Sequence, residues 1–383
     1  MILKAASCAV YSFKIFSSIF FDVRKIFGCG IRVVRSNMRG LSKVFVTGGT
    51  GFIGTRLVNE LVRRGHTVHV LKRPTSNIDG LEGGDIRFFE GDLWDCDSIR
   101  KGMEGCQQVY HLAAYAKNWA KDSTIYYRSN VDGFCDVWEV AKSLGVERIV
   151  FTSTFVTCGP SVPGRVEDET RYCFAAECRT DYQSSKMMGE KQACQYAAQG
   201  FPVVIVNPTR VYGPGRLTEG NSVSRMIDLY DRGRFPFLLN QGINVGNYAF
   251  VEDVVQGIIL AMEKGRIGER YILGGENVSF KQFFKLIDEI DGKRHAQVNI
   301  PPWIAFLYSR LEERKAKWFG HYPLITAGWV ETFLQDWAYS SAKAEKELGY
   351  KITPFREGIR ITLEWLRHLR KKPHDPIQHI NFV

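Results

Sequence analysis

The 383-residue sequence lacks the features of a membrane-spanning or disulfide-stabilised protein. It contains no run of about twenty apolar residues, so we expect no integral membrane segment. Its nine cysteines are irregularly spaced and include no C-x-x-C pair. An odd number of scattered cysteines is typical of reduced thiols in a reducing compartment rather than of a disulfide scaffold.

Acidic residues are almost absent from residues 1–40, which hold seven Lys or Arg but only one acid, Asp22. This segment therefore carries +6 of the chain's net charge of +10. Its composition resembles a transit peptide, so we expect a mitochondrial or plastid protein. The alternatives are a surface amphipathic helix, a disordered tail or a membrane-lying anchor, and without targeting the protein would be cytoplasmic. The remaining chain has no basic helix that would suggest a nucleic-acid partner.

Side chains are also scarce in "VFVTGGTGFIG", residues 44–54, between a β-branched run and a helical pattern. Gly48, Gly51 and Gly54 are spaced three residues apart. In a strand–turn–helix unit they would allow a tight turn, the approach of a pyrophosphate and close helix packing. The phosphates would then meet the first N–H groups of the helix, at Phe52, Ile53 and Gly54. A glycine-rich turn without a ligand is the alternative.

The chain alternates between β-branched runs and helical patterns up to residue 209. We expect further strands at 66–72, 86–93, 108–114, 148–154 and 202–209, with helices between most of them. This order predicts an α/β fold, a Rossmann-like doubly wound parallel sheet. Beyond it, helical patterns dominate, near 221–233, 251–264, 279–291, 303–318 and 355–371. We therefore predict an extension at 1–40, an NAD(P)-binding domain at 41–209, a smaller, mostly helical substrate lobe at 210–371 interleaved with it, and a tail at 372–383.

The end of the second strand lacks the acid that usually binds the ribose 2′-hydroxyl of NAD. Lys72 and Arg73 stand there instead. Two cations suit a 2′-phosphate, so we expect NADP to be preferred, with NAD as the other option. Solvated surface charge is the alternative explanation.

"TDYQSSKMMGEK" places Tyr182 and Lys186 four residues apart, on one face of an expected helix. A free tyrosine has a pKa of about 10 and is a poor base at neutral pH. A neighbouring ammonium would lower that pKa, which makes the pair a candidate for proton transfer. Ser153 and Thr154 end the fifth strand and are candidates to hold a substrate oxygen. An ordinary amphipathic pair is the alternative, and we expect no metal.

Several motifs together resemble the extended short-chain dehydrogenase/reductases of the NAD-dependent epimerase/dehydratase type, over residues 42–370. They are "TGGTGFIG", "GDL" at 91–93, "HLAA" at 111–114, "SNVDG" at 129–133, the Tyr182/Lys186 pair and "NPTRVYGPG" at 207–215. "GRIGERYILGGENVSFKQ" and "YSSAKAEKELGY" resemble the branch that includes dihydroflavonol reductases and plant farnesol dehydrogenase. Many members have Ser at the position of Thr154, and H-V-D-D where this chain has "FVED".

The resemblance implies that Tyr182 is the general acid/base and that Lys186 binds the nicotinamide ribose and tunes Tyr182. The other cofactor contacts that it implies are Asp92 and Leu93 at the adenine, Ala113 and Ala114 along the cofactor, and Pro208 beside the nicotinamide.

The substrate has to be inferred from the residues around the expected site. Tyr115 and Trp119 follow the fourth strand, and Phe155 follows the fifth. With Tyr126, Tyr127, Phe174 and Phe237 they suggest an apolar lining for a lipophilic alcohol or carbonyl, although most aromatic side chains simply pack in a core. Arg210 and Arg216 would instead suit the diphosphate of a nucleotide sugar.

Three functions follow. The first is an NAD(P)-dependent oxidoreductase acting on a small lipophilic molecule, and the second is a nucleotide-sugar epimerase or dehydratase. The third is a non-catalytic scaffold with the same fold. A small-molecule substrate is the expected partner, and a homodimer is one possible assembly.

Overall fold

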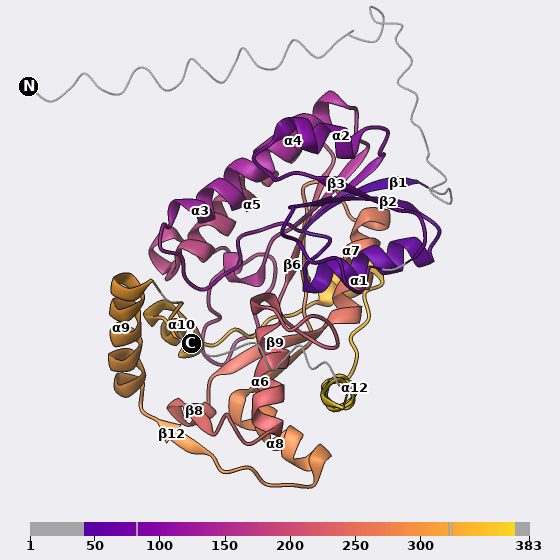
Figure 1. The fold of residues 1–383 in the computed structure, drawn as a ribbon. Coiled ribbons are helices and arrows are strands. Elements are labelled where there is room, and N and C mark those ends of the chain that lie inside the picture. Colours follow the sequence, from indigo (N-terminus) through magenta and orange to yellow (C-terminus); the bar gives the residue numbers. More distant parts are fainter. Residues whose placement is uncertain (1–41, 82, 321, 324, 372–383) are drawn as a thin grey trace, which may run out of the picture. The chain divides into compact units, whose positions relative to one another are not determined.

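The computed structural model describes residues 42–371, except 82, 321 and 324. The expected transit segment at 1–40 and the tail at 372–383 lie outside the described residues. The centre of the described part is a seven-stranded parallel sheet with the order β10-β6-β5-β4-β1-β2-β3 (Figure 1). Its strands are β1 (Lys43–Thr47), β2 (Thr67–Lys72), β3 (Ile86–Glu90), β4 (Gln108–His111), β5 (Arg148–Thr152), β6 (Val203–Pro208) and β10 (Arg270–Leu273).

Helices cover both faces of this sheet. One face carries α1 (Phe52–Arg63), α7 (Val251–Lys264) and α11 (Ala342–Leu348). The other carries α2 (Cys96–Met103), α4 (Gly133–Ser143) and α5 (Asp181–Ala198). The short α3 (Thr124–Tyr127) leads through a π-helical turn at Arg128–Asp132 into α4. The predicted Rossmann-like, doubly wound sheet is therefore confirmed.

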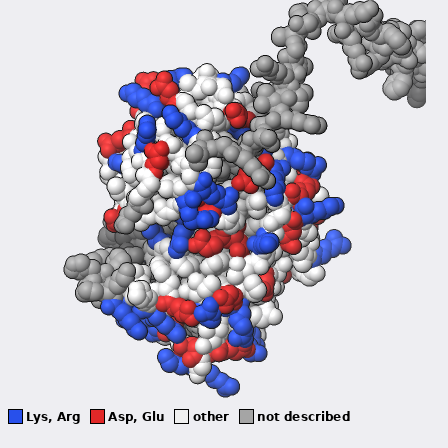
Figure 2. Space-filling model, turned by 90° about the vertical axis from the view of Figure 1, so that its right-hand side faces the viewer, with Lys and Arg blue, Asp and Glu red and all other residues white. Residues whose placement is uncertain are grey.

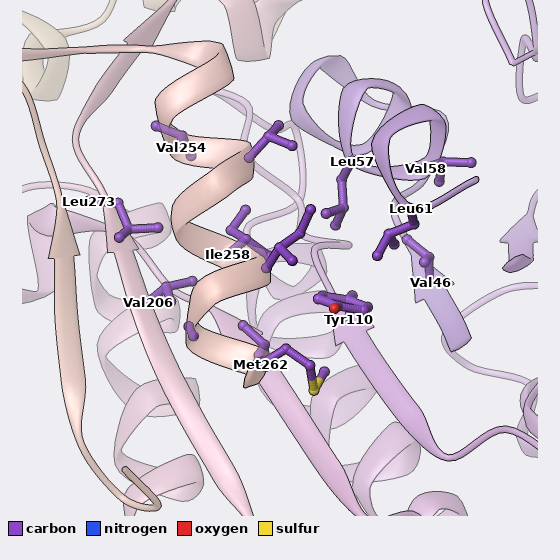
Figure 3. Packing of buried hydrophobic residues seen from close by; sticks show 14 of the residues in the cluster. Val46, Leu57, Val58, Leu61, Tyr110, Val206, Val254, Ile258, Met262 and Leu273 are labelled. Atoms are coloured by element: carbon purple, nitrogen blue, oxygen red, sulfur yellow. The ribbon is translucent and has the colours of Figure 1, made fainter. Parts of the chain in front are cut away.

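The period-two pattern of the strands explains the two layers. Val44 and Val46 of β1 point to the α1 and α7 side, whereas Phe45 between them points to the α2 and α4 side. Figure 3 shows the first of these cores, in which Leu57 and Leu61 of α1 and several α7 side chains meet the sheet. A strand buried on both faces needs apolar residues throughout, which is why these strands read as continuous apolar runs.

The C-terminal part contributes more strands than the sequence predicted. β10 completes the main sheet by pairing with β6. β7 (Arg210–Tyr212), β9 (Val245–Phe250) and β11 (Glu276–Ser279) form a three-stranded sheet, and β8 (Phe237–Leu239) pairs with β12 (Val298–Ile300). Besides α7 and α11, the helices of this part are α6 (Ser222–Asp231), α8 (Phe280–Asp291), α9 (Pro302–Phe319), α10 (Ala327–Phe333) and α12 (Phe355–Arg370).

The surface seen in Figure 2 intersperses acidic and basic side chains. Ion pairs such as Arg63–Glu60 and Arg360–Glu364 are typical of the exposed helices. Among the described residues, no helix is both long and apolar enough to cross a membrane.

Candidate active site

The glycine loop joins β1 to α1 at the carboxyl edge of the sheet. Gly48 has a φ of +73°, and a Cβ built on it would lie 2.6 Å from the backbone nitrogen of Ala113. A Cβ on Gly54 would overlap the carbonyl oxygen of Gly48, so α1 approaches the turn this closely only because the side chain is missing. Gly51 is the N-cap of α1 and supplies no side-chain cap. The positive end of this helix is therefore left available for an anion.

A cavity of about 280 Å³ adjoins this loop and is lined by the residues that the motifs suggested for the cofactor. They include Gly48, Gly51, Lys72, Arg73, Asp92, Leu93, Ala113 and Ala114. The glycine turn, the uncapped helix end and this cavity together fit a dinucleotide with its diphosphate at the N-terminus of α1. Asp92 and Leu93, which the resemblance implies to be adenine contacts, line the same cavity.

The two cations at the end of β2 differ in their surroundings. Lys72 lies opposite Glu90 in the strand register, and its Nζ is 3.1 Å from a Glu90 carboxylate oxygen. Arg73 is exposed and lines both cavities of the site. Among the described residues, no partner is found for its guanidinium group. The sequence predicted two free cations here, and the structure leaves only Arg73 unpaired because β3 brings an acid beside Lys72.

Tyr182 and Thr154 meet at the carboxyl edge of β5. The Tyr182 hydroxyl forms a hydrogen bond with the Thr154 side chain, and burial raises the pKa of Tyr182 to about 12. Burial disfavours the phenolate more than the bond from Thr154 favours it. The sequence led us to expect a pKa lowered by Lys186. The structure shows the opposite, because burial raises the pKa of Tyr182. The Lys186 ammonium donates instead to the Thr152 carbonyl oxygen at 2.9 Å.

Lys186 is almost fully buried at the start of α5, with 2% of its surface exposed. Burial lowers its pKa to about 8, and the carboxylate of Glu190, one helical turn further on, partly opposes this shift. Its Nζ also lies 4.8 Å from the centre of the Phe151 ring, a cation–π contact. The ammonium is thus held by a carbonyl oxygen, an aromatic face and a nearby carboxylate.

Glu190 organises a buried polar network that sequence reasoning missed. One of its carboxylate oxygens accepts from Ser153 Oγ at 2.5 Å, Thr157 Oγ1 at 2.7 Å and Asn207 Nδ2 at 2.8 Å. The other oxygen lies 2.9 Å from Nε of Arg270, and both side chains are nearly inaccessible.

This network separates the two hydroxyl candidates at the end of β5. The Ser153 proton is donated to Glu190, whereas the Thr154 side chain contacts Tyr182. The Thr154 backbone is fixed as well, because its carbonyl oxygen accepts from Asn207 Nδ2 at 3.0 Å. Thr154 is therefore the hydroxyl placed beside the phenol.

Asn130 is a second residue that was not singled out from the sequence. It lies in the π-helical turn, and such turns are frequent at functional sites. Its Oδ1 accepts from the backbone N–H of Tyr115 at 2.8 Å, and its Nδ2 donates to Ser185 Oγ at 2.9 Å. It thereby ties the segment after β4 to the helix of Tyr182 and Lys186. Its position in "SNVDG" was the available signal.

A larger cavity, of about 750 Å³, adjoins the first and contains the catalytic candidates. The predicted site residues that line it are Gly48, Gly51, Phe52, Ile53, Gly54, Arg73, Ala114, Ser153, Thr154, Phe155, Tyr182, Lys186, Pro208 and Arg210. Its outer wall carries aromatic side chains of the C-terminal part, namely Trp329, Phe333 and Trp337. These three were missed because they lie about 150 residues beyond Tyr182, in a stretch with no motif.

The other aromatic candidates lie elsewhere. Tyr115 lines the smaller cavity rather than the larger one. Within the described residues, Trp119 lines neither cavity and instead packs edge-on against Tyr322. Phe174 and Phe237 do not line the cavities either, since they are 67% and 50% exposed to solvent.

Three other residues that the sequence suggested for the substrate make contacts within the protein. Tyr126 is buried and donates to the Lys117 carbonyl oxygen, and Tyr127 donates to Asp181. Arg216 holds the loop after β2 through the carbonyl oxygens of Asn77 and Asp79.

Comparison with known proteins agrees with this geometry. The model of the NAD dependent epimerase/dehydratase family matches residues 44–274. The chain belongs to this family. It is 32% identical to a Synechocystis protein named as a dihydroflavonol 4-reductase, over 85% of this chain and 94% of the relative.

Two further proteins are similar over nearly their whole lengths. The sterol demethylase protein B of Methylococcus capsulatus is 31% identical, over 84% of this chain and 97% of the relative. The crystal structure of gox2253 is 30% identical, with a TM-score of 0.74, and covers 85% of this chain and 98% of that one. The protein is thus an NAD(P)-dependent oxidoreductase of the epimerase/dehydratase family.

Proposed function

We propose that this member of the family interconverts an alcohol and a carbonyl on a small lipophilic substrate, with NADP(H) as the preferred cofactor. The observation that carries the proposal is the larger cavity. Its base holds Thr154 and Tyr182, and its walls carry Phe155, Trp329 and Phe333. Aromatic walls beside the hydroxyl groups of Thr154 and Tyr182 suit a lipophilic molecule that presents one oxygen to those hydroxyls.

The described residues account for the handling of the proton. Thr154 and Tyr182 would both hydrogen-bond the substrate oxygen, and Tyr182 would transfer the proton. The bound nicotinamide would supply or accept the hydride. With a pKa of about 12, the Tyr182 phenol keeps its proton at neutral pH. This favours reduction of a carbonyl, in which the oxygen must receive a proton, as the direction that the site assists.

Arg210 supports a substrate with one further polar group. It lines the larger cavity, and its guanidinium lies 4.6 Å from the centre of the Phe333 ring. Within the described part of the chain, its buried Nη2 has no hydrogen-bond partner. A buried hydrogen-bond donor without a partner destabilises the protein. A hydrogen-bond acceptor on the substrate could therefore pair favourably with Nη2 of Arg210.

The relatives are consistent with the proposal, since their names describe a dihydroflavonol reductase and a protein of sterol demethylation. Sterols are largely apolar, and dihydroflavonols are aromatic molecules that carry a carbonyl and hydroxyl groups. A farnesol-like or dihydroflavonol-like molecule is accordingly the substrate class that we propose for this chain.

The test is a panel of substrates offered to the purified full chain while the absorbance of the reduced cofactor is followed. We expect turnover with lipophilic ketones, aldehydes or alcohols. The nucleotide-sugar alternative predicts no net change in cofactor absorbance with these compounds and conversion of a nucleotide sugar instead, a result that would replace the proposal.

A further inference from the structure

The outward face of α9 is more apolar than its inward face, which reverses the usual pattern of a surface helix. Its exposed apolar side chains are Trp303, Ile304, Leu307, Leu311, Trp318 and Phe319. Trp318 and Phe319 are 78% and 77% exposed, and Trp303 is 67% exposed. Figure 1 shows α9 at the margin of the drawn molecule, beside α10. Contiguous exposed apolar surface of this kind marks an interaction site.

The inward face of the same helix is built from small and polar residues. Ala305, Ser309 and Ala316 are buried, so α9 sits close to the rest of the protein. Glu312 is buried as well, and its carboxylate pairs with Lys315. The large apolar side chains of α9 are therefore not used for its own packing, and they are free to contact something outside.

The charges of α9 are divided between the same two faces. Arg310, Arg314, Lys315 and Lys317 are exposed. Of the two acids, Glu312 is buried and pairs with Lys315, and Glu313 accepts from the backbone N–H of Ala327 at 2.8 Å. The exposed face of α9 thus contains cations and large apolar groups but no acid.

We propose that this face docks the protein on the surface of a bilayer that contains anionic lipid. Tryptophan, leucine and phenylalanine would enter the boundary between headgroups and acyl chains, and the arginines and lysines would meet the phosphates. The helix lies on the bilayer and does not cross it, since no described helix is long and apolar enough to do so.

The docked helix would stand next to the larger cavity. Glu313 ties α9 to the N-terminus of α10, and Trp329 and Phe333 of α10 line the cavity. A molecule dissolved in the bilayer would therefore be close to the aromatic wall. The docking itself does not rest on the proposed function, because its test measures binding and not turnover.

The test is co-sedimentation of the full chain with vesicles, together with hydroxyl-radical footprinting of the side chains. The vesicles contain phosphatidylcholine alone or a mixture with phosphatidylglycerol. We expect binding to the mixed vesicles, weaker binding at high salt, and protection of Trp303 and Trp318 on binding. Footprinting is needed because residues 1–40 could bind lipid independently, and binding that leaves α9 unprotected would overturn the proposal.

Variants separate the apolar from the ionic contribution. We expect Trp303→Ser with Trp318→Ser, and separately Arg310→Gln with Arg314→Gln, to weaken binding to the mixed vesicles by about tenfold or more. The matched control is Ile243→Ser with Ile267→Ser, which removes exposed apolar side chains outside α9 and should bind like the wild type.

A second copy of the chain is the competing occupant of this face. Gel filtration without vesicles detects it. If the wild type is a dimer and the tryptophan variant a monomer, the face is a protein interface and the membrane proposal is wrong.

Discussion

At the residue scale, the site depends on a lysine held in a nearly dry environment. Lys186 has a pKa of about 8, lowered by burial and partly restored by Glu190. Below this pH the ammonium is charged, and above it the charge is lost. If the charged form binds the cofactor, kcat/KM will be level below about pH 8 and will fall above it.

Replacing Glu190 tests this assignment. Glu190→Gln removes the negative charge that raises the pKa of Lys186. The fall of kcat/KM with rising pH, the falling limb of the profile, should therefore move to lower pH. Glu147→Gln, on an exposed acid, is the matched control and should leave the limb in place. Thermal unfolding of both variants shows whether they remain folded over this pH range. A limb that stays at the wild-type pH in folded Glu190→Gln would refute the role given to Glu190.

We assign the expected preference for NADP mainly to Arg73. A charge-assisted hydrogen bond contributes about 1.5–3 kcal/mol, so Arg73→Asn should weaken NADP binding by about tenfold or more and change NAD binding little. Lys72→Asn should have a smaller effect, because Glu90 already pairs with Lys72. Calorimetry with both dinucleotides measures these differences. Tighter binding of NAD than of NADP by the wild type would show that the charge argument is wrong.

Which site residues the sequence could predict depends on how local their signals are. Tyr182 and Lys186 lie one helical turn apart, and the glycines lie in one loop, so spacing alone was informative. The pair of Glu190 and Arg270 spans 80 residues and forms only when β10 joins the sheet. The exposed positions of Phe174 and Phe237 could not be predicted, because aromatic composition does not say whether a side chain points inward.

At the scale of elements, the long periodic segments were predictable and the short ones were not. β1 to β6 lie in runs of β-branched or aromatic residues, and the helices α7 and α12 carry apolar patterns over many residues. β7, β8 and β12 have only three residues each. Such strands form because neighbouring chain segments offer partners, and that information is not local.

The junction of β1 and α1 provides a test at this scale. Gly54→Ala adds a Cβ that would overlap the Gly48 carbonyl oxygen, so α1 must shift away from the turn. We expect dinucleotide affinity to fall by at least about tenfold, because the helix end no longer meets the diphosphate. Gly220→Ala is the control, since its Cβ would make only ordinary contact. Fluorescence titration with the reduced dinucleotide measures both, and unchanged affinity in Gly54→Ala would contradict the assignment of the loop.

At the scale of the whole molecule, residues 1–40 stand apart in composition. Their net charge of +6 and single acid lead us to propose that they direct the protein to a mitochondrion or plastid. Fused to a fluorescent reporter, this segment should send the reporter to one of these organelles. Changing its Arg and Lys residues to Gln should abolish this targeting. If the reporter stays in the cytosol with the unchanged segment, the targeting proposal is wrong. Whether the chain forms a homodimer stays a prediction that gel filtration can test.

The most direct measurement of the central claim follows deuterium from the reduced cofactor into the product. The full chain is given a substrate found in the panel and NADPH that carries deuterium at both C4 positions, and the product is analysed by mass spectrometry. The account predicts one deuterium on the carbinol carbon of each product alcohol. Tyr182→Phe should keep the fold but lower this rate by ~10²–10⁴, because the proton donor is missing. Product without deuterium, or wild-type turnover by Tyr182→Phe, would contradict the account.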